Sequence, residues 1–443
     1  MPIWLREKLF QKKFLFDKLK KHDKNFIDIN KIKFSEHHYS HAASAFYPSP
    51  FKEALVLTLD GVGEWATTTL AIGKNNSLKM LKEIHFPHSL GLLYSAFTYY
   101  CGFKVNDGEY KLMGLAPYGK PIYKDLIYNN LITVYQDGTF KLNQKFFDYS
   151  TGLTMINSNF ENLFGRKAKK IDEKIDQFYM DVAASIQLVL EEIILKICKH
   201  IKAEYKISNL CLAGGVALNC VINGKIEKEK VFENVWIQPA AGDAGGALGS
   251  ALYLWNSLTF NEDSKIQKQN IDTMKGSYLG PSYSNDEVKV MLDRMNATYQ
   301  YMEEENLMDF VAKQISEQKI FGWFQGKMEF GPRALGNRSI LGDPRSDKMQ
   351  KNLNLKVKYR ESFRPFAPSI MREDVSDWFE LYKDSPYMLF VAKVKKDKTI
   401  QMNDDQKKLF GIDLLNIKKS EIPAVTHVDY SARIQTVTRE SNK

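Results

Sequence analysis

The 443-residue sequence predicts an α/β protein, and three observations lead to this fold class. Residues 53–73 form two β-rich runs joined by the stretch DGVGE, which is typical of a β-hairpin. Residues 181–201 have the apolar period of a long helix. The stretches 209–226 and 239–252 each place a glycine-rich turn before a helix. Strands that alternate with glycine turns and helices favour the α/β class.

The N-terminal part adds two further elements. Residues 1–25 mix Lys with Leu and Phe, which predicts an amphipathic helix packing its apolar stripe inward, with a membrane-surface helix as the alternative. Residues 31–47 predict a short strand that runs into a histidine-bearing helix, ending near Pro48. Because no apolar run is long enough to span a bilayer, we expect no membrane partner.

Composition and charge limit the class of protein. A hydrophobic content of 44% and a charged content of 26% are typical of a globular protein long enough for two domains. We predict domains at 1–255 and 276–443, joined by a polar linker at 256–275. The four cysteines form no C-x-x-C pair, which favours a reducing cytoplasm. The net charge of +9 suits an anionic ligand, and we do not expect nucleic acid.

A histidine pair gives the first candidate site. His37 and His41 are four residues apart, so a helix would place them on one face, at metal-ligand spacing. Plain packing or surface exposure is the alternative for such a pair. A metal needs further ligands, and Asp60, in the predicted hairpin turn, and Asp243, in a glycine turn, are the best candidates. Two imidazoles and two carboxylates suit Fe(II), Mn(II) or Zn(II).

Basic residues give the second candidate site. Residues 327–364 hold ten Lys or Arg against four acids, which by default is a solvated face. Arg333 and Arg338, however, lie in the restricted turn GPRALGNRS, and Arg364 lies in FRPFAP. Arginines fixed in this way form clamps for phosphate or carboxylate. The glycine turn of LAGGVALNCVINGKI, which opens a helix, suits a nucleotide phosphate, with close packing as the alternative.

Seven motifs in order resemble the O-carbamoyltransferase family, which includes nodulation-factor and antibiotic-tailoring enzymes: HHYSHAASAFYPSPF, LDGVGEWATT, DGEYKLMGLAPYG, AGGVALN, GDAGGALG, MEFGPRALGNRSIL and YRESFRPFAPS. The resemblance implies an actin-like ATPase domain of duplicated ribonuclease H-like type, followed by an α/β domain similar to threonylcarbamoyl-adenylate synthase. It also implies ATP-dependent O-carbamoyl transfer. In the family, the second domain uses ATP with Mg²⁺ to activate carbamoyl phosphate to carbamoyl adenylate, and the first transfers the carbamoyl group to a hydroxyl of a sugar or secondary metabolite.

The same resemblance implies roles for individual residues. Four would bind a divalent metal, Fe(II) in preference to Mn(II) or Zn(II): His37, His41, Asp60 and Asp243. Three would hold carbamoyl phosphate: Lys358, Arg364 and Arg333. Five would contact the nucleotide: Gly214, Gly215, Asn219, Gly246 and Arg338.

Three features depart from the family pattern. The family's first strand and HDSAA-like turn have no counterpart before residue 33, no further sheet follows THVDYSARIQTV, and Tyr430 stands where glycine is expected. We therefore expect a first domain lacking its first strands, a second domain incomplete at its C-terminal side, and unpaired sheet edges. A tRNA threonylcarbamoyl transferase, or an inactive or split fragment that needs a partner chain, are the alternative readings.

Overall fold

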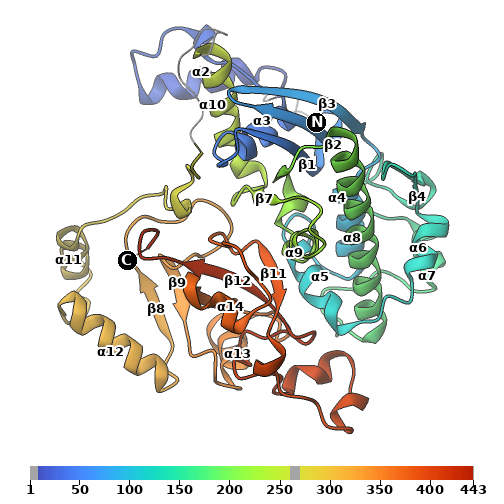
Figure 1. The fold of residues 1–443 in the computed structure, drawn as a ribbon. Helices are drawn as coiled ribbons and strands as arrows, with labels where there is room; N and C mark the ends of the chain where they lie inside the picture. The colour runs from blue at the N-terminus through green and yellow to red at the C-terminus, as the bar shows by residue number, and fades with distance from the viewer. Residues whose placement is uncertain (1–7, 260–269, 443) are drawn as a thin grey trace.

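The computed structural model describes residues 8–259 and 270–442, which form two packed α/β parts (Figure 1). The helices are α2 (Gln11–His22), α3 (His37–Phe46), α4 (Leu90–Tyr100), α5 (Glu109–Leu115), α6 (Lys124–Asn130), α7 (Ser158–Phe164), α8 (Gln177–Tyr205), α9 (Cys220–Lys228), α10 (Asp243–Thr259), α11 (Asn285–Arg294), α12 (Glu304–Ser316), α13 (Met349–Asn352) and α14 (Val375–Trp378). The strands are β1 (Glu53–Gly63), β2 (Ala66–Lys74), β3 (Ser77–His85), β4 (Ile132–Val134), β5 (Phe140–Leu142), β6 (Asn209–Ala213), β7 (Asn234–Ile237), β8 (Phe321–Phe324), β9 (Arg338–Leu341), β10 (Ser369–Met371), β11 (Phe390–Lys393) and β12 (Ser431–Val437).

A five-stranded mixed sheet organises the first part, in the order β3-β2-β1-β6-β7. Strands β1, β2 and β3 pair antiparallel, whereas β1, β6 and β7 run parallel. Residues 54–59 of β1 are all buried, because α3 packs on the strand from one side and α4 from the other. The predicted long helix is confirmed as α8, and the strand at 209–213 as β6. The α/β class predicted from the sequence is therefore confirmed.

The hairpin at 53–73 is also confirmed, but its predicted turn was wrong. The chain reverses at Glu64 and Trp65, and Glu64 takes a left-handed conformation with φ 58°. Asp60 lies four residues before Glu64, still on β1, where the pairing register with β2 shifts between Leu59 and Gly63. The D-G signal therefore marks a bulge rather than the turn, and the bulge redirects the Asp60 side chain.

Two other expectations near the N-terminus fail. The basic helix α2 has no buried residue, and Phe14 and Leu19 remain 41% and 44% exposed, so its apolar stripe does not pack inward. No strand forms at 31–35, where the chain passes from a 3₁₀ turn at Ile29–Lys31 into α3. In the predicted linker, residues 256–259 continue α10, while 260–269 lie outside the described residues.

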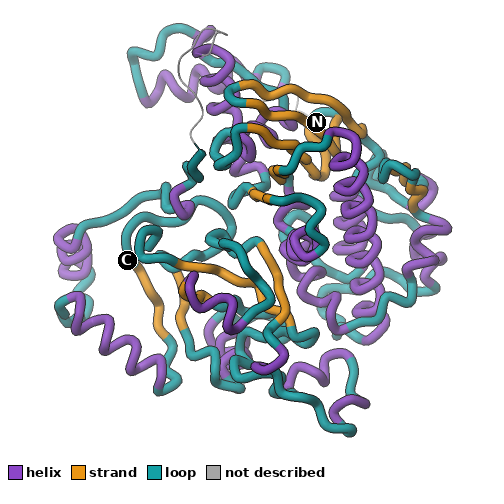
Figure 2. The backbone as a smooth tube through the Cα atoms, viewed as in Figure 1, coloured by secondary structure: helices purple, strands orange, loops and turns teal. Residues whose placement is uncertain are grey.

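The second part consists largely of loops (Figure 2) around two small sheets. Strands β10-β12-β11 form one sheet and β8-β9 form the other. Helix α13 continues into a π-helical turn at Leu353–Val357, which ends at Lys358. Such widened turns occur often at functional sites. No described helix is both long and apolar enough to cross a membrane.

A single hydrophobic core joins the two parts. Phe363 and Leu389 of the second part belong to the same buried cluster as Leu57 of β1. The contact between α9 and β11 is so close that a Cβ on Gly224 would lie 2.1 Å from the carbonyl oxygen of Val391. The two parts are therefore in direct backbone contact, and their loops meet at one cavity.

Candidate metal centre and anion site

The carboxyl ends of three parallel strands position the first site. Asp60 lies near the end of β1, Gly215 follows β6, and Asp243 opens α10 after β7. Parallel strands end at the same edge of a sheet, which is where open α/β sheets bind their ligands. The N–H of Gly215 donates to Asp60 Oδ1 at 3.0 Å, and this bond fixes the carboxylate. The other oxygen of Asp60 is free to face α3.

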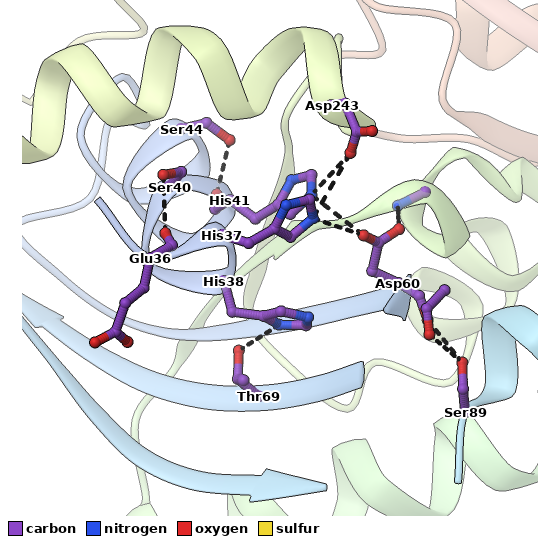
Figure 3. A network of polar contacts seen from close by, with 12 residues as sticks. Glu36, His37, His38, Ser40, His41, Ser44, Asp60, Thr69, Ser89 and Asp243 are labelled. Carbon is purple, nitrogen blue, oxygen red and sulfur yellow. Dashed lines mark hydrogen bonds and ion pairs between the residues drawn. The ribbon is translucent and has the colours of Figure 1, made fainter. Parts of the chain in front are cut away.

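Two histidines of α3 complete the group (Figure 3). His37 Nε2 and His41 Nε2 lie 3.0 Å apart, as their four-residue spacing requires. Asp60 Oδ2 is 2.9 Å from His37 Nε2 and 3.4 Å from His41 Nε2. Asp243 Oδ1 lies 3.6 Å from both nitrogens, and its side chain is 83% exposed. The sequence-predicted metal set thus converges on one point, with Asp243 on the solvent side.

The donor set fits a divalent metal ion. One ligand atom from each of His37, His41, Asp60 and Asp243 lies within 4.8 Å of the other three. Nitrogen and oxygen ligands at about 2.1 Å from a shared ion are separated by roughly 3.0–3.4 Å at octahedral or tetrahedral angles. The measured separations of 2.9–3.6 Å match this range. These four residues would therefore hold the ion.

Without a cation, the group retains a proton. Burial of the His41 ring opposes its protonation, but the carboxylates of Asp243 and Asp60 outweigh this and raise its pKa to about 9. Burial would raise the pKa of Asp60, yet hydrogen bonds with His37 and His41 hold that pKa well below its usual range. Two ionised carboxylates thus draw one positive charge onto the imidazole pair. A divalent metal would replace that proton.

The neighbouring histidine has a different role. His38 extends from α3 toward strand β2, where its Nδ1 lies 3.2 Å from Thr69 Oγ1 (Figure 3). Burial lowers its pKa to about 4, so the ring is neutral. Of the three clustered histidines, two belong to the metal set and one links α3 to the sheet.

A cavity of about 700 Å³ extends from this metal set to the second part. Its walls include Asp60 and Asp243 of the metal set, Tyr110 of α5 and Arg333 of the second part. The volume lies in the range of pockets for small molecules. Arg333 donates from Nη2 to the carbonyl oxygen of Leu218 at 3.2 Å, so the guanidinium is anchored to the glycine turn.

Arg333 belongs to a cluster of cations. We name it the basic cluster: Arg333, Lys358, Arg360, Arg364 and Arg433. Burial, with help from Arg360 and Arg364, lowers the pKa of Lys358. Burial and the guanidinium of Arg333 lower the pKa of Arg433 to about 9. Cations that depress one another's pKa favour a bound anion.

One buried amide shapes the loop that carries three of these cations. Asn354 is fully buried, and its Nδ2 donates to the carbonyl oxygens of Ser362 and Arg364 at 3.1 and 2.9 Å. Its Oδ1 accepts from Arg360 Nε at 2.6 Å. The loop from Lys358 to Arg364 is therefore wrapped around a single side chain.

The comparisons with known proteins agree with this geometry. Residues 1–252 match the model of the carbamoyltransferase N-terminus, and residues 312–443 match that of the carbamoyltransferase C-terminus. The chain belongs to the carbamoyltransferase family.

Its relatives are longer proteins. An uncharacterized protein of Synechocystis sp. is 55% identical over 100% of this chain, which spans 72% of that protein. Nodulation protein NolNO of Sinorhizobium fredii is 37% identical over 94% of the chain, which spans 56% of the relative. Nodulation protein NolO of Bradyrhizobium diazoefficiens is 34% identical over 92% of the chain, which spans 68% of it.

In this carbamoyltransferase chain, two of the five predicted nucleotide residues line the cavity, and the other three are not among its lining residues. Gly215 and Asn219 line the cavity. Gly214 has φ 86°, and a Cβ there would lie 2.2 Å from the carbonyl oxygen of Leu59, so its role is close packing of two strands. A Cβ built on Gly246 would lie 3.9 Å from Cε1 of His41. Arg338 lies elsewhere: it donates to the carbonyl oxygens of residues 325, 326 and 337 and stacks on a phenylalanine ring.

Sequence reasoning missed two residues of the basic cluster and its loop. Arg433 was not singled out, because it lies about seventy positions after Arg364 and joins the cluster from β12, where it pairs with Val391 of β11. Asn354 was missed because a single asparagine between basic residues carries no distinguishing signal. The THVDYSARIQTV motif, already noted for Tyr430, was the available pointer to Arg433.

Proposed function

We propose that this chain carries ATP-dependent O-carbamoyl transfer, from carbamoyl phosphate through carbamoyl adenylate to a hydroxyl of a sugar or secondary metabolite. The proposal rests on one cavity. It is lined by Asp60 and Asp243, which belong to the four-donor metal set, and by Arg333, a member of the basic cluster. An anion site and a metal site that share a cavity suit a reaction that activates a phosphorylated donor and then transfers its acyl group.

The proposed roles of the residues follow from their chemistry. Water first cleaves carbamoyl phosphate to carbamate and inorganic phosphate, and the cations Lys358, Arg364 and Arg333 hold the phosphate. A carbamate oxygen then attacks the α-phosphorus of ATP, and pyrophosphate leaves while the same cations offset the developing charge. The backbone of Gly215 offers donors for the nucleotide, and Asp60 and Asp243 face the same space. A bound divalent ion would supply Lewis acidity toward a carbonyl or phosphoryl oxygen. The acceptor hydroxyl then attacks the carbamoyl carbon, and AMP leaves.

The resemblance also gives the proposed architecture. We infer that the five-stranded sheet is one ribonuclease H-like half of an actin-like ATPase domain, and that residues 276–443 form the adenylate-forming domain. The match of residues 312–443 to the carbamoyltransferase C-terminus supports this function over tRNA threonylcarbamoyl transfer. The chain spans 56–72% of the relatives described above, and the test below shows whether the activity needs further polypeptide.

The test is ATP–pyrophosphate exchange that depends on carbamoyl phosphate. We expect Arg364→Ala to abolish exchange, because it removes a member of the basic cluster. Arg345→Ala is the matched control, since Arg345 is 62% exposed and pairs with Asp343 outside the cluster. A folded, metal-loaded chain without exchange would contradict a self-sufficient activation site, and exchange regained on adding the missing parts of a longer relative would indicate a split enzyme.

A further inference from the structure

Helix α5 of the first part contacts the basic cluster of the second. Lys111 Nζ lies 2.8 Å from Glu361 Oε1, although the two residues are 250 positions apart. Their side chains are only 22% and 30% exposed, so water screens this pair less than a surface ion pair. Burial opposes ionisation of Glu361, but the hydrogen bond from Lys111 outweighs it and lowers the pKa of this carboxyl. The Glu361 carboxylate is therefore ionised at neutral pH.

The same carboxylate contacts the anion-binding arginine. Glu361 Oε2 is 3.6 Å from Arg364 Nη1. The guanidinium carbon of Arg364 also lies 4.4 Å from the centre of the Tyr110 ring, in a cation–π contact. Adjacent residues of α5 thus restrain one guanidinium in two ways, Tyr110 directly and Lys111 through Glu361.

Helix α5 is itself fixed beside the metal set. Glu109 Oε1 accepts from Ser95 Oγ at 2.7 Å and from the N–H of Asn106 at 3.0 Å, which holds the first turn of α5 to the first part. Glu109 and Tyr110 line the cavity that Asp60 and Asp243 also line. Helix α5 therefore both lines this cavity and holds Arg364.

Charge explains why such a restraint is needed. Arg364 lies among cations, and it lowers the pKa of both Lys358 and Arg360. Repulsion within such a group moves a flexible arginine toward solvent unless opposing contacts hold it. Glu361 supplies the opposing charge, and Lys111 fixes the direction in which Glu361 points.

We propose that Lys111 and Tyr110 are positioning residues that set Arg364 for anion binding, so that the part carrying the metal set controls the anion clamp of the other part. This inference rests on the proposed function, which assigns Arg364 to the phosphate. The anion and the Lys111–Glu361 pair act on the same guanidinium, so anion binding and the contact between the parts are coupled.

The first experiment compares carbamoyl phosphate dependence of ATP–pyrophosphate exchange in four forms of the full chain. We expect Lys111→Met to raise the KM for carbamoyl phosphate about 5- to 10-fold, at the low end of coupling between sites, with a smaller effect on kcat. Lys111→Arg should restore most of the affinity. Lys124→Met is the matched control, because Lys124 pairs with Glu192 at 2.7 Å within the first part. Equal KM values for Lys111→Met and wild type overturn the inference.

A second readout separates this inference from the proposed function. Amide hydrogen exchange of residues 358–364 reports the order of the arginine loop without any reaction. We expect Lys111→Met and Tyr110→Leu to speed exchange there, Lys124→Met to leave it unchanged, and inorganic phosphate to slow it in wild type. If wild type shows no carbamoyl phosphate-dependent turnover, the proposed function fails, and the loop exchange alone decides the positioning role. Unchanged exchange in both α5 variants refutes it.

Discussion

A single methyl group at Gly63 is expected to disable the metal set. A Cβ built on Gly63 lies 2.1 Å from Cδ2 of His37 and 2.7 Å from its Cβ. Rotating the imidazole cannot relieve the second contact, because the Cβ atom does not move with the side-chain torsions. The helix α3 must therefore shift away from β1, and His37 shifts with it.

The size of the effect follows from these distances. To reach an ordinary contact of 3.4 Å, the ring must retreat by about 1.3 Å, whereas metal–ligand distances tolerate about 0.2 Å. Disturbing the orientation of a ligand costs about 10–100-fold in metal affinity. At a metal concentration 100 times the wild-type Kd, binding stabilises the protein by about 2.7 kcal/mol. A 100-fold loss of affinity leaves about 0.4 kcal/mol of this stabilisation.

The assay is chemical denaturation with and without added Mn(II) or Zn(II), together with direct metal titration. Gly246→Ala is the matched control, because its Cβ would meet His41 at an ordinary 3.9 Å and it lies within α10. We expect this control to keep its metal response and to gain roughly 0.5–1 kcal/mol from helix propensity. Full metal affinity in Gly63→Ala would refute the reasoning, as would a larger loss in Gly246→Ala.

Three further outcomes are expected. Gly249→Ala places a Cβ 1.7 Å from the carbonyl oxygen of Ser40, so separation of α3 and α10 should cost about 1–3 kcal/mol or more in denaturation and weaken metal binding. Arg433→Met should weaken carbamoyl phosphate binding in calorimetry at least about fivefold while leaving metal affinity unchanged, because charge-assisted hydrogen bonds act only at the anion. Burial lowers the pKa of Lys419 to about 8, below its unfolded value, so the unfolded chain binds the extra proton and stability rises with pH from about 8 to 10.5. Lys419→Met should remove this rise, at most about 1.4 kcal/mol per pH unit, and a parallel pH dependence in both proteins would contradict it.

The metal set was predictable because its signals are local. A four-residue histidine spacing becomes a shared face as soon as the segment is helical, and α3 is helical. Asp60 lies near the end of β1 and Asp243 follows β7, and parallel strands bring such positions to one edge. The predicted turn was wrong because the same D-G pair serves a bulge, which local sequence does not distinguish from a turn. The fold class was predictable for the same reason, because the apolar patterns of strands and helices lie within single segments of the sequence.

The link between the parts was not predictable, because its partners lie far apart in the chain. Nothing near Lys111 indicates Glu361, and nothing near Arg364 indicates Tyr110. The prediction that the apolar stripe of α2 packs inward was wrong for a related reason. Amphipathic spacing predicts that a helix has an apolar face to bury, but only the tertiary structure supplies a surface to bury it against. Sequence patterns thus specify surfaces, whereas their partners depend on the folded chain.

The basic run shows how structure resolves an ambiguous charge signal. Arg338 donates to several backbone carbonyls and Arg345 forms a paired contact with Asp343, so both are satisfied within the protein. In the basic cluster, by contrast, the buried Nε atoms of Arg333 and Arg433 have no hydrogen-bond partner among the described residues. A guanidinium that is already satisfied gains little from a ligand, while a buried one with spare donors gains much. Counting unsatisfied donors rather than positive charges therefore separates candidate anion-binding arginines from structural ones, and by this measure Arg333 and Arg433 are better candidates than Arg338.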